Sequence, residues 1–140
     1  EKIQRARSMG AVGSVNYLTT PKWHERVMEL TDGVGVDVVV EVGGAGTLER
    51  SVAATRVAGR IALIGVLAGG TMNPTMMMRK SIRLQGIYVG SHDMFKRMNE
   101  AVSTNQLKPV IDQTFPFADA ASAYYAMQRA EHLGKLVVTF

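Results

Sequence analysis

The sequence has no cysteine, few aromatic residues and no long apolar run, and each absence excludes a class of protein. Without cysteine, disulfide bonds and thiolate metal sites are excluded within the chain. No apolar stretch approaches the roughly 18 residues that a transmembrane helix needs, and no charged-then-apolar leader is present. We therefore expect no membrane partner and a cytoplasmic location.

The basic residues are scattered along the chain, although the net charge is +4 and the isoelectric point is near 9.6. Aromatic residues make up only 6% of the chain, too few among the lysines and arginines to form a platform for stacking bases. No run of like charges of the kind that binds nucleic acid occurs. This distribution is typical of a solvated surface, and we expect no nucleic-acid partner.

Apolar periodicity and turn residues predict strands that alternate with helices. Thr20 is expected to cap a helix with Pro21 at its first position, and Ser91 to cap another with Phe95 and Met98 on its buried side. The strand at 36–42 is almost continuously apolar, as in parallel strands that are covered on both faces. Strands are expected at 12–17, 36–42, 60–66, 82–89 and 134–140, helices at 1–9, 20–30, 47–57, 74–81, 91–105 and 119–130, a turn at Ala58–Gly59, and extended chain at 109–117.

The stretch VDVVVEVGGAGTLE, residues 36–49, resembles a phosphate-binding turn but lacks two of its parts. A dinucleotide fingerprint needs three spaced glycines and an acidic residue at the end of the next strand. Glu49 stands in place of the third glycine, and the next strand ends in Ile64-Gly65-Val66 without a carboxylate. Two successive strands nevertheless end in glycine, Gly43 and Gly65, which predicts a ligand edge where backbone can approach a ligand closely.

The order of these strand-end motifs resembles the C-terminal part of the medium-chain dehydrogenase/reductase family, which includes zinc-type alcohol dehydrogenases and quinone oxidoreductases. The similar segments are VDVVVEVGGAGTLERS, GRIALIGVLAG, LQGIYVGS, LKPVIDQTFPF and GKLVV. The resemblance implies an α/β chain with a partial Rossmann domain, whose mostly parallel, doubly wound sheet holds strands 3 to 6 of the family order. Residues 1–106 would form this cofactor domain, and residues 107–140 the C-terminal part of the catalytic domain.

The resemblance also implies which residues lie near a bound cofactor, NADP or NAD. The ends of the fourth, fifth and sixth family strands would surround the nicotinamide and its ribose. Lys135 would approach the pyrophosphate, and Lys2 and Tyr17 would lie near the adenosine ribose and its 2′-phosphate, which favours NADP. The cofactor-binding residues so implied are Lys2, Tyr17, Val42, Gly43, Gly44, Ile64, Gly65, Val66, Ile87, Tyr88, Val89 and Lys135.

By the same resemblance, the full-length protein would transfer hydride between the nicotinamide and a small alcohol or carbonyl, or a quinone or enone. Any zinc would be held by the upstream catalytic half, and we expect no metal ligand and no catalytic residue within this chain. The family also implies a homodimer through Met76–Val89, a region where the adaptable methionines suit a contact. The alternative is a non-enzymatic structural or RNA-binding relative, supported by the basic isoelectric point.

Further expectations concern the isolated chain and four of its polar residues. In the family order 3-2-1-4-5-6, the strand at 12–17 would have no neighbour, so we expect it to be displaced or the chain to assemble through the edge near 82–89. The isolated chain should lack activity and bind the cofactor weakly or not at all. Glu41, on a buried-strand pattern, is expected to bond backbone, and His24, His92 and His132 are too isolated to be metal ligands.

Overall fold

The computed structural model describes residues 2–140, which divide into two compact units, one ending at Val89 and the other beginning at Gly90. The first unit contains α1 (Lys2–Ser8), α2 (Trp23–Leu30), β1 (Val36–Glu41), α3 (Ala45–Ala54), β2 (Thr55–Leu63), α4 (Thr75–Arg79) and β3 (Arg83–Gly86). The second contains α5 (His92–Thr104), β4 (Ile111–Pro116), the 3₁₀ turn η1 (Phe117–Asp119), α6 (Ala120–Arg129) and β5 (Lys135–Thr139). The family-based division after residue 106 stays a prediction, because it concerns evolutionary domains rather than compactness.

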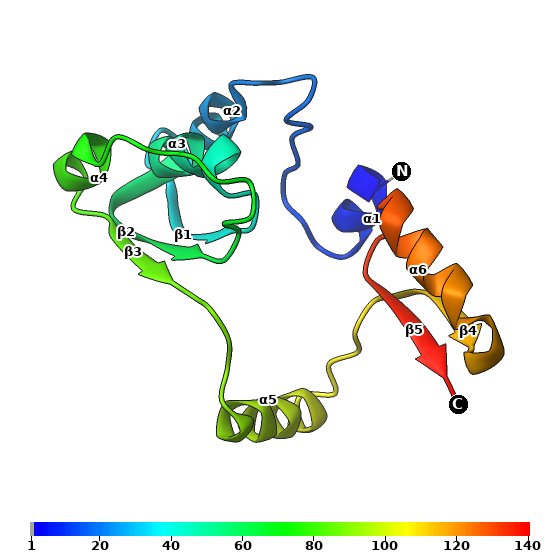
Figure 1. Cartoon of the computed structure of the whole chain (residues 1–140). Coiled ribbons are helices and arrows are strands. Elements are labelled where there is room, and N and C mark those ends of the chain that lie inside the picture. The colour runs from blue at the N-terminus through cyan, green and yellow to red at the C-terminus, as the bar shows by residue number, and fades with distance from the viewer. Residues whose placement is uncertain (1) are drawn as a thin grey trace. The chain divides into compact units, whose positions relative to one another are not determined.

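The first unit is built on a parallel sheet in the order β1-β2-β3. Helix α3 lies along one face of β1 and β2, and α2 packs beside α3 (Figure 1). The core forms where Leu48 and Val52 of α3 meet Ile61 of β2. The apolar side chains packed around that centre are Val39, Leu63, Met72, Met77, Ile82 and Leu84. The alternating α/β pattern and the parallel sheet confirm the predicted fold class.

The predicted boundary between α3 and β2 was wrong. The helix ends at Ala54, and β2 already begins at Thr55, so the expected turn at Ala58–Gly59 lies within the strand. That turn is a bulge, because the pairing shifts between Val36↔Thr55 and Val38↔Arg60. Lys80 helps to end the helix: its Nζ donates to the carbonyls of Val52, Ala53 and Thr55 at 3.3, 2.7 and 2.5 Å. Burial lowers the pKa of the Lys80 ammonium.

Residues 12–17 do not form the predicted strand and are irregular. The sheet order places β1 at an edge with only β2 beside it, so this segment has no strand there to pair with. The helix expected from Thr20 begins instead at Trp23, because the Thr20 amide donates to the Asn16 carbonyl in a preceding turn at 2.9 Å. The N-cap position of α2 is Lys22, whose side chain makes no capping hydrogen bond.

In the second unit, β4 and β5 pair in parallel and α6 packs against both, in agreement with the elements expected after residue 107. Ser91 caps α5 as predicted, since its hydroxyl oxygen accepts from the Met94 amide at 3.2 Å. The expectation that Phe95 and Met98 are buried was wrong, because these side chains are exposed. An apolar helix stripe is buried only where another element packs on it, and spacing alone cannot show that.

Candidate functional site

The carboxyl ends of the three parallel strands form one edge of the first unit, and the ends of β1 and β2 are joined by hydrogen bonds. The amides of Ile64 and Gly65 both donate to the Glu41 carbonyl at 2.9 Å. The Ile87 amide donates to the Leu63 carbonyl at 2.9 Å, so the chain after β3 continues along the same edge. The structure therefore brings the predicted segments Val42–Gly44, Ile64–Val66 and Ile87–Val89 to one edge of one sheet.

The strand-end glycines allow two backbone segments to pack directly against each other. A Cβ atom on Gly65 would lie 2.1 Å from the Val42 carbonyl oxygen, far inside contact distance. Gly44 has a positive φ of +77°, and a Cβ atom there would lie 2.9 Å from the Gly65 carbonyl oxygen. Packing of the loops thus accounts for these glycines, and ligand approach is a second use that the same bare backbone permits.

The Glu41 carboxylate fixes the conformation of the loop after β1. Its Oε1 atom accepts from the amides of Gly43 and Gly44 at 2.7 and 3.0 Å and from the Thr47 hydroxyl at 2.6 Å. Its Oε2 atom accepts from the Ser51 hydroxyl. The expectation that Glu41 bonds backbone is confirmed.

Burial and hydrogen bonding act on the Glu41 carboxyl in opposite directions. Desolvation raises its pKa, because only 3% of the residue is exposed. Hydrogen bonds from Ser51, Thr47, Gly43 and Gly44 lower the pKa, and together they bring it below its usual value. The carboxylate is therefore charged at neutral pH although it is buried.

Apolar side chains line the open part of this edge. Val42, Ile64 and Val66 are 69%, 43% and 62% exposed, and Tyr88 and Val89 are also exposed. Exposed apolar side chains beside accessible backbone can receive a flat ring and offer it polar groups at its rim. The edge thus combines exposed apolar side chains with backbone donors and acceptors.

Three predicted residues lie outside this edge. Lys2 is exposed on α1, and Lys135 is exposed at the start of β5 in the second unit. Tyr17 is exposed in a turn, but it lines a groove of about 860 Å³ that also reaches Val42 and Gly43. The groove runs beside β1, with Trp23 and Val27 of α2 on its wall. Tyr17 thus lines the same groove as two residues of the predicted edge.

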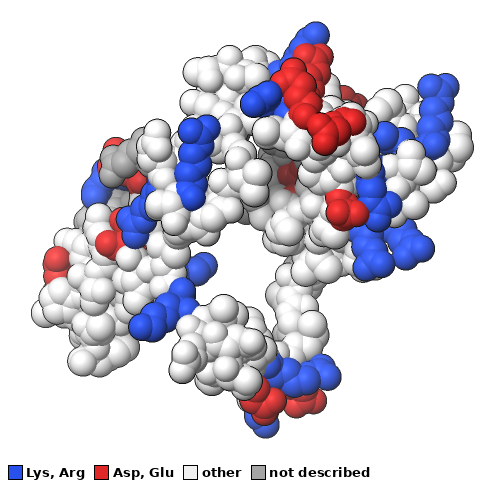
Figure 2. Space-filling model, turned by 180° about the vertical axis from the view of Figure 1, so that it is seen from behind, with Lys and Arg blue, Asp and Glu red and all other residues white. Residues whose placement is uncertain are grey.

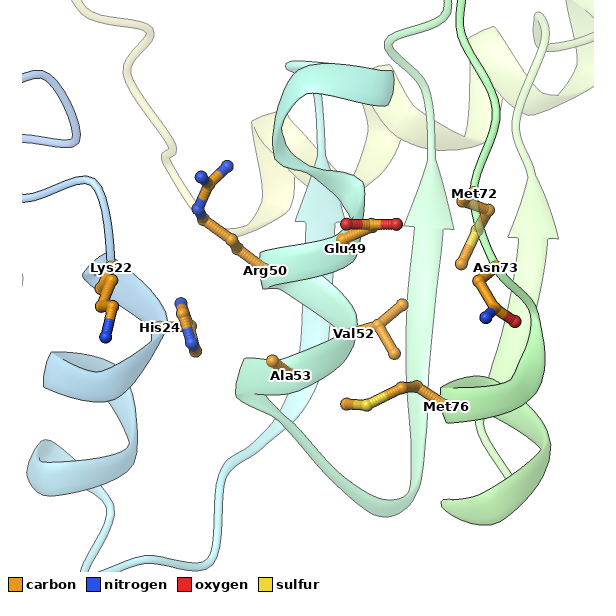
Figure 3. A pocket seen from close by; sticks show the side chains of 9 residues that line it. All are labelled: Lys22, His24, Glu49, Arg50, Val52, Ala53, Met72, Asn73 and Met76. Atoms are coloured by element: carbon orange, nitrogen blue, oxygen red, sulfur yellow. The ribbon is translucent and has the colours of Figure 1, made fainter.

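A second hollow, of about 490 Å³, lies around the outer side of α3 (Figure 3). Figure 3 shows Lys22 and His24 near α2 on one side of the helix, and Met72, Asn73 and Met76 on the other. Its lining holds none of the strand-end residues. Within residues 2–140 no group of three or more histidine or acidic side chains could hold a metal ion. None of the helices described there is both long and apolar enough to span a bilayer.

Sequence reasoning missed the two hydroxyl groups that complete the Glu41 network. Thr47 and Ser51 follow Glu41 by six and ten positions and lie four residues apart on α3, so both hydroxyls face the end of β1. The signal was present in the pattern E-x-x-x-x-x-T-x-x-x-S. It becomes meaningful only when the strand and the helix are known to be antiparallel neighbours in one βα unit.

The parallel sheet, its covering helix and the glycine-ended edge define a Rossmann-type α/β protein. The sequence model of the zinc-binding dehydrogenase family matches residues 1–104, so the chain belongs to that family. A zinc-type alcohol dehydrogenase-like protein of Schizosaccharomyces pombe is 34% identical over 99% of this chain and 42% of its own length. The resemblance read from the strand-end motifs is thus confirmed.

Solved structures agree with this assignment. A Sinorhizobium meliloti 1021 protein provisionally named an alcohol dehydrogenase is 35% identical, with a TM-score of 0.89 over 99% of this chain and 41% of that one. An NAD-dependent alcohol dehydrogenase is 32% identical, with a TM-score of 0.85 over 99% of this chain and 40% of that one. The chain therefore spans about two fifths of the length of the relatives it matches.

Proposed function

We propose that this chain is the C-terminal part of a longer NAD(P)-dependent oxidoreductase. The longer protein transfers a hydride between the cofactor and an alcohol or carbonyl, or a quinone or enone, of small size. The observation that carries this proposal is the edge at which Val42–Gly44, Ile64–Val66 and Ile87–Val89 meet with apolar side chains exposed. Family membership and the dehydrogenase and reductase names of the relatives support it.

In this function the nicotinamide cofactor supplies the hydride chemistry, and the chain binds and orients it. Val42, Ile64 and Val66 present apolar surface to the nicotinamide ring. When the ring covers these side chains, water is excluded from the site. The hydrogen bonds from Ile64 and Gly65 to the Glu41 carbonyl keep the two loops at a fixed spacing. No residue of this chain is assigned a catalytic role.

The remaining predicted residues extend the cofactor proposal. Lys135 would pair with the pyrophosphate. Lys2 and Tyr17 would lie near the adenosine ribose and its 2′-phosphate, so NADP is the favoured form. The domain division at residues 106 and 107 belongs to the same proposal. Zinc, where the protein uses it, would be bound upstream of this chain. The isolated chain would be inactive and would bind NAD(P) weakly or not at all. The proposed location of the longer protein is the cytoplasm.

We also propose that the longer protein forms a homodimer through Met76–Val89. Strand β3 is an outermost strand of the sheet, so the backbone hydrogen-bonding groups on its outer side are available to a second copy. Met76, Met78 and Ile87 are exposed beside it. Sedimentation of the longer protein should give a dimer, and a charged substitution, Ile87→Glu, should shift it toward the monomer. A monomer at micromolar concentration would contradict this part of the proposal.

The proposal is tested by cofactor binding and turnover. The longer protein should bind NADH or NADPH in calorimetric titration and oxidise it with an aldehyde, quinone or enone from a small panel. The 140-residue chain alone should show no turnover, and turnover by it would overturn the expected inactivity. Absence of binding and of turnover in the longer protein would overturn the function.

A non-enzymatic, RNA-binding role is the alternative. Figure 2 shows lysines and arginines in separate groups, with acidic residues between several of them, on the visible face of the molecule. The sequence likewise holds no block of like charges that would form a phosphate-binding track. Salt-dependent RNA binding by the longer protein, without cofactor binding, would favour this alternative.

A further inference from the structure

Glu41 holds both strand-end loops at once, one through its main chain and one through its side chain. Its carbonyl accepts from Ile64 and Gly65, which fixes the loop after β2. Its carboxylate accepts from Gly43 and Gly44, which fixes the loop after β1. The relative placement of the two loops therefore passes through one buried residue.

The chemistry of the carboxylate goes beyond filling space in the core. Among the described residues no lysine or arginine pairs with it, and its partners are two amides and two hydroxyls. A buried charge without a cation costs free energy that must be offset by well-formed hydrogen bonds. Charge-assisted bonds to neighbouring amides are directional, so they allow the glycine loop few alternative conformations.

We infer that Glu41 is a positioning residue that sets the spacing between Val42 and Ile64 for the nicotinamide end of the cofactor. This inference rests on the proposed function. Because only 3% of the residue is exposed and its acceptors are taken up by the loop, it acts through the loops that it fixes. Loss of its acceptors would let Gly43 and Gly44 adopt other conformations and would widen or skew the site.

The test separates the nicotinamide end of the cofactor from the adenosine end. In the longer protein, Glu41→Leu removes the acceptors, and titration compares NADH and NADPH with ADP and its 2′-phosphate, which lack both the nicotinamide and its ribose. The dissociation constant of the complete cofactor should rise about tenfold or more, the scale of one lost charge-assisted hydrogen bond. Binding of the two ADP compounds should stay within about twofold, because they end at the pyrophosphate and do not reach these loops.

Two further variants make the result specific. Glu41→Gln should restore most of the affinity, because one amide oxygen can still accept from Gly43, Gly44 and Thr47 while the amide nitrogen donates to Ser51. Asp37→Leu is the matched control on the same strand, since Asp37 is exposed and pairs only at the surface with Arg56. Asp37→Leu should leave the dissociation constants of both kinds of ligand unchanged.

Each outcome supports or overturns the inference. Equal weakening of the complete cofactor and ADP, or unchanged binding of both, would overturn it. If Glu41→Leu does not fold, Thr47→Val removes one donor to the carboxylate and should weaken only the complete cofactor, by a smaller factor. Failure of the wild-type protein to bind any of these ligands would instead refute the proposed function.

Discussion

The two faces of the β1-β2-β3 sheet differ in cover although β1 presents valines to both. On one face Val39, Glu41 and Ile61 meet α3 and are partly or fully buried. On the other face Val38 and Val40 are exposed, and Ala62 lies between them and β3. The expectation that β1 is covered on both faces is thus met on one face only. Apolar content shows that a strand can be buried, and a neighbouring element decides whether it is.

The largest expected effect comes from truncating the covered face. Ile61→Ala should lower the free energy of unfolding by about 2–5 kcal/mol, because Ile61 is fully buried and a cavity would remain. Ile64→Ala on the same chain segment, where the side chain is 43% exposed, should cost less than about 1 kcal/mol. Urea unfolding of the 140-residue chain measures both. Equal losses would show that the core around Ile61 is not packed in solution.

Glycine substitutions sharpen the comparison at the strand ends. Gly65→Ala should destabilise the chain by about 1–3 kcal/mol, because its Cβ would clash with the rigid Val42 carbonyl. Gly46→Ala, in the first turn of α3 with open space around it, should stabilise by up to about 1 kcal/mol through helix propensity. Thermal unfolding should give shifts of opposite sign. A tolerated Gly65→Ala would mean that the two loops are not in contact.

Acid should reveal the buried carboxylate on the covered face. The Glu41 pKa is lower in the folded chain than its ordinary value of 4.5, so its stabilisation is complete above that pH and is lost as pH falls toward the folded pKa. Glu41→Gln should cost about 1–3 kcal/mol at neutral pH, and the difference from wild type should shrink below pH 4.5. Asp37→Asn is the exposed control. A difference that grows in acid would contradict the lowered pKa.

The smallest effect is expected on the open face. Val40→Thr places a hydroxyl where the side chain is already solvated, so unfolding should change by less than about 0.5 kcal/mol. Val52→Thr puts the same group into the hydrophobic core between α3 and the sheet. This change should lower the free energy of unfolding by about 1–3 kcal/mol. Chemical denaturation compares the two. A large loss from Val40→Thr would indicate that this face is covered in solution.

Local chemistry was sufficient to predict most elements and the strand-end edge. The β-branched run before Gly43 and the glycine after Ile64 identified two parallel strands and the edge where they end. The Ser91 cap was also predictable, because capping depends on neighbouring residues. Family resemblance added the assignment of the strands and the expected cofactor, which periodicity could not supply.

The errors arose where a partner outside the local sequence decides the structure. Residues 12–17 read as a strand, yet a strand needs a neighbour, and β1 has none on that side. The α3–β2 junction was misplaced because Lys80, far along the chain, binds the carbonyls at the end of the helix. The Glu41–Ser51 contact was missed for the same reason, since it joins a strand end to the second turn of a helix.

The most direct measurement follows the glycine amides of the longer protein during cofactor titration. With ¹⁵N-glycine labelling, the Gly43, Gly44 and Gly65 signals should shift when NADH or NADPH binds and should remain in place when ADP binds. That result would locate the nicotinamide at the ends of β1 and β2. Saturable cofactor binding that leaves these three signals unmoved would contradict the proposed site.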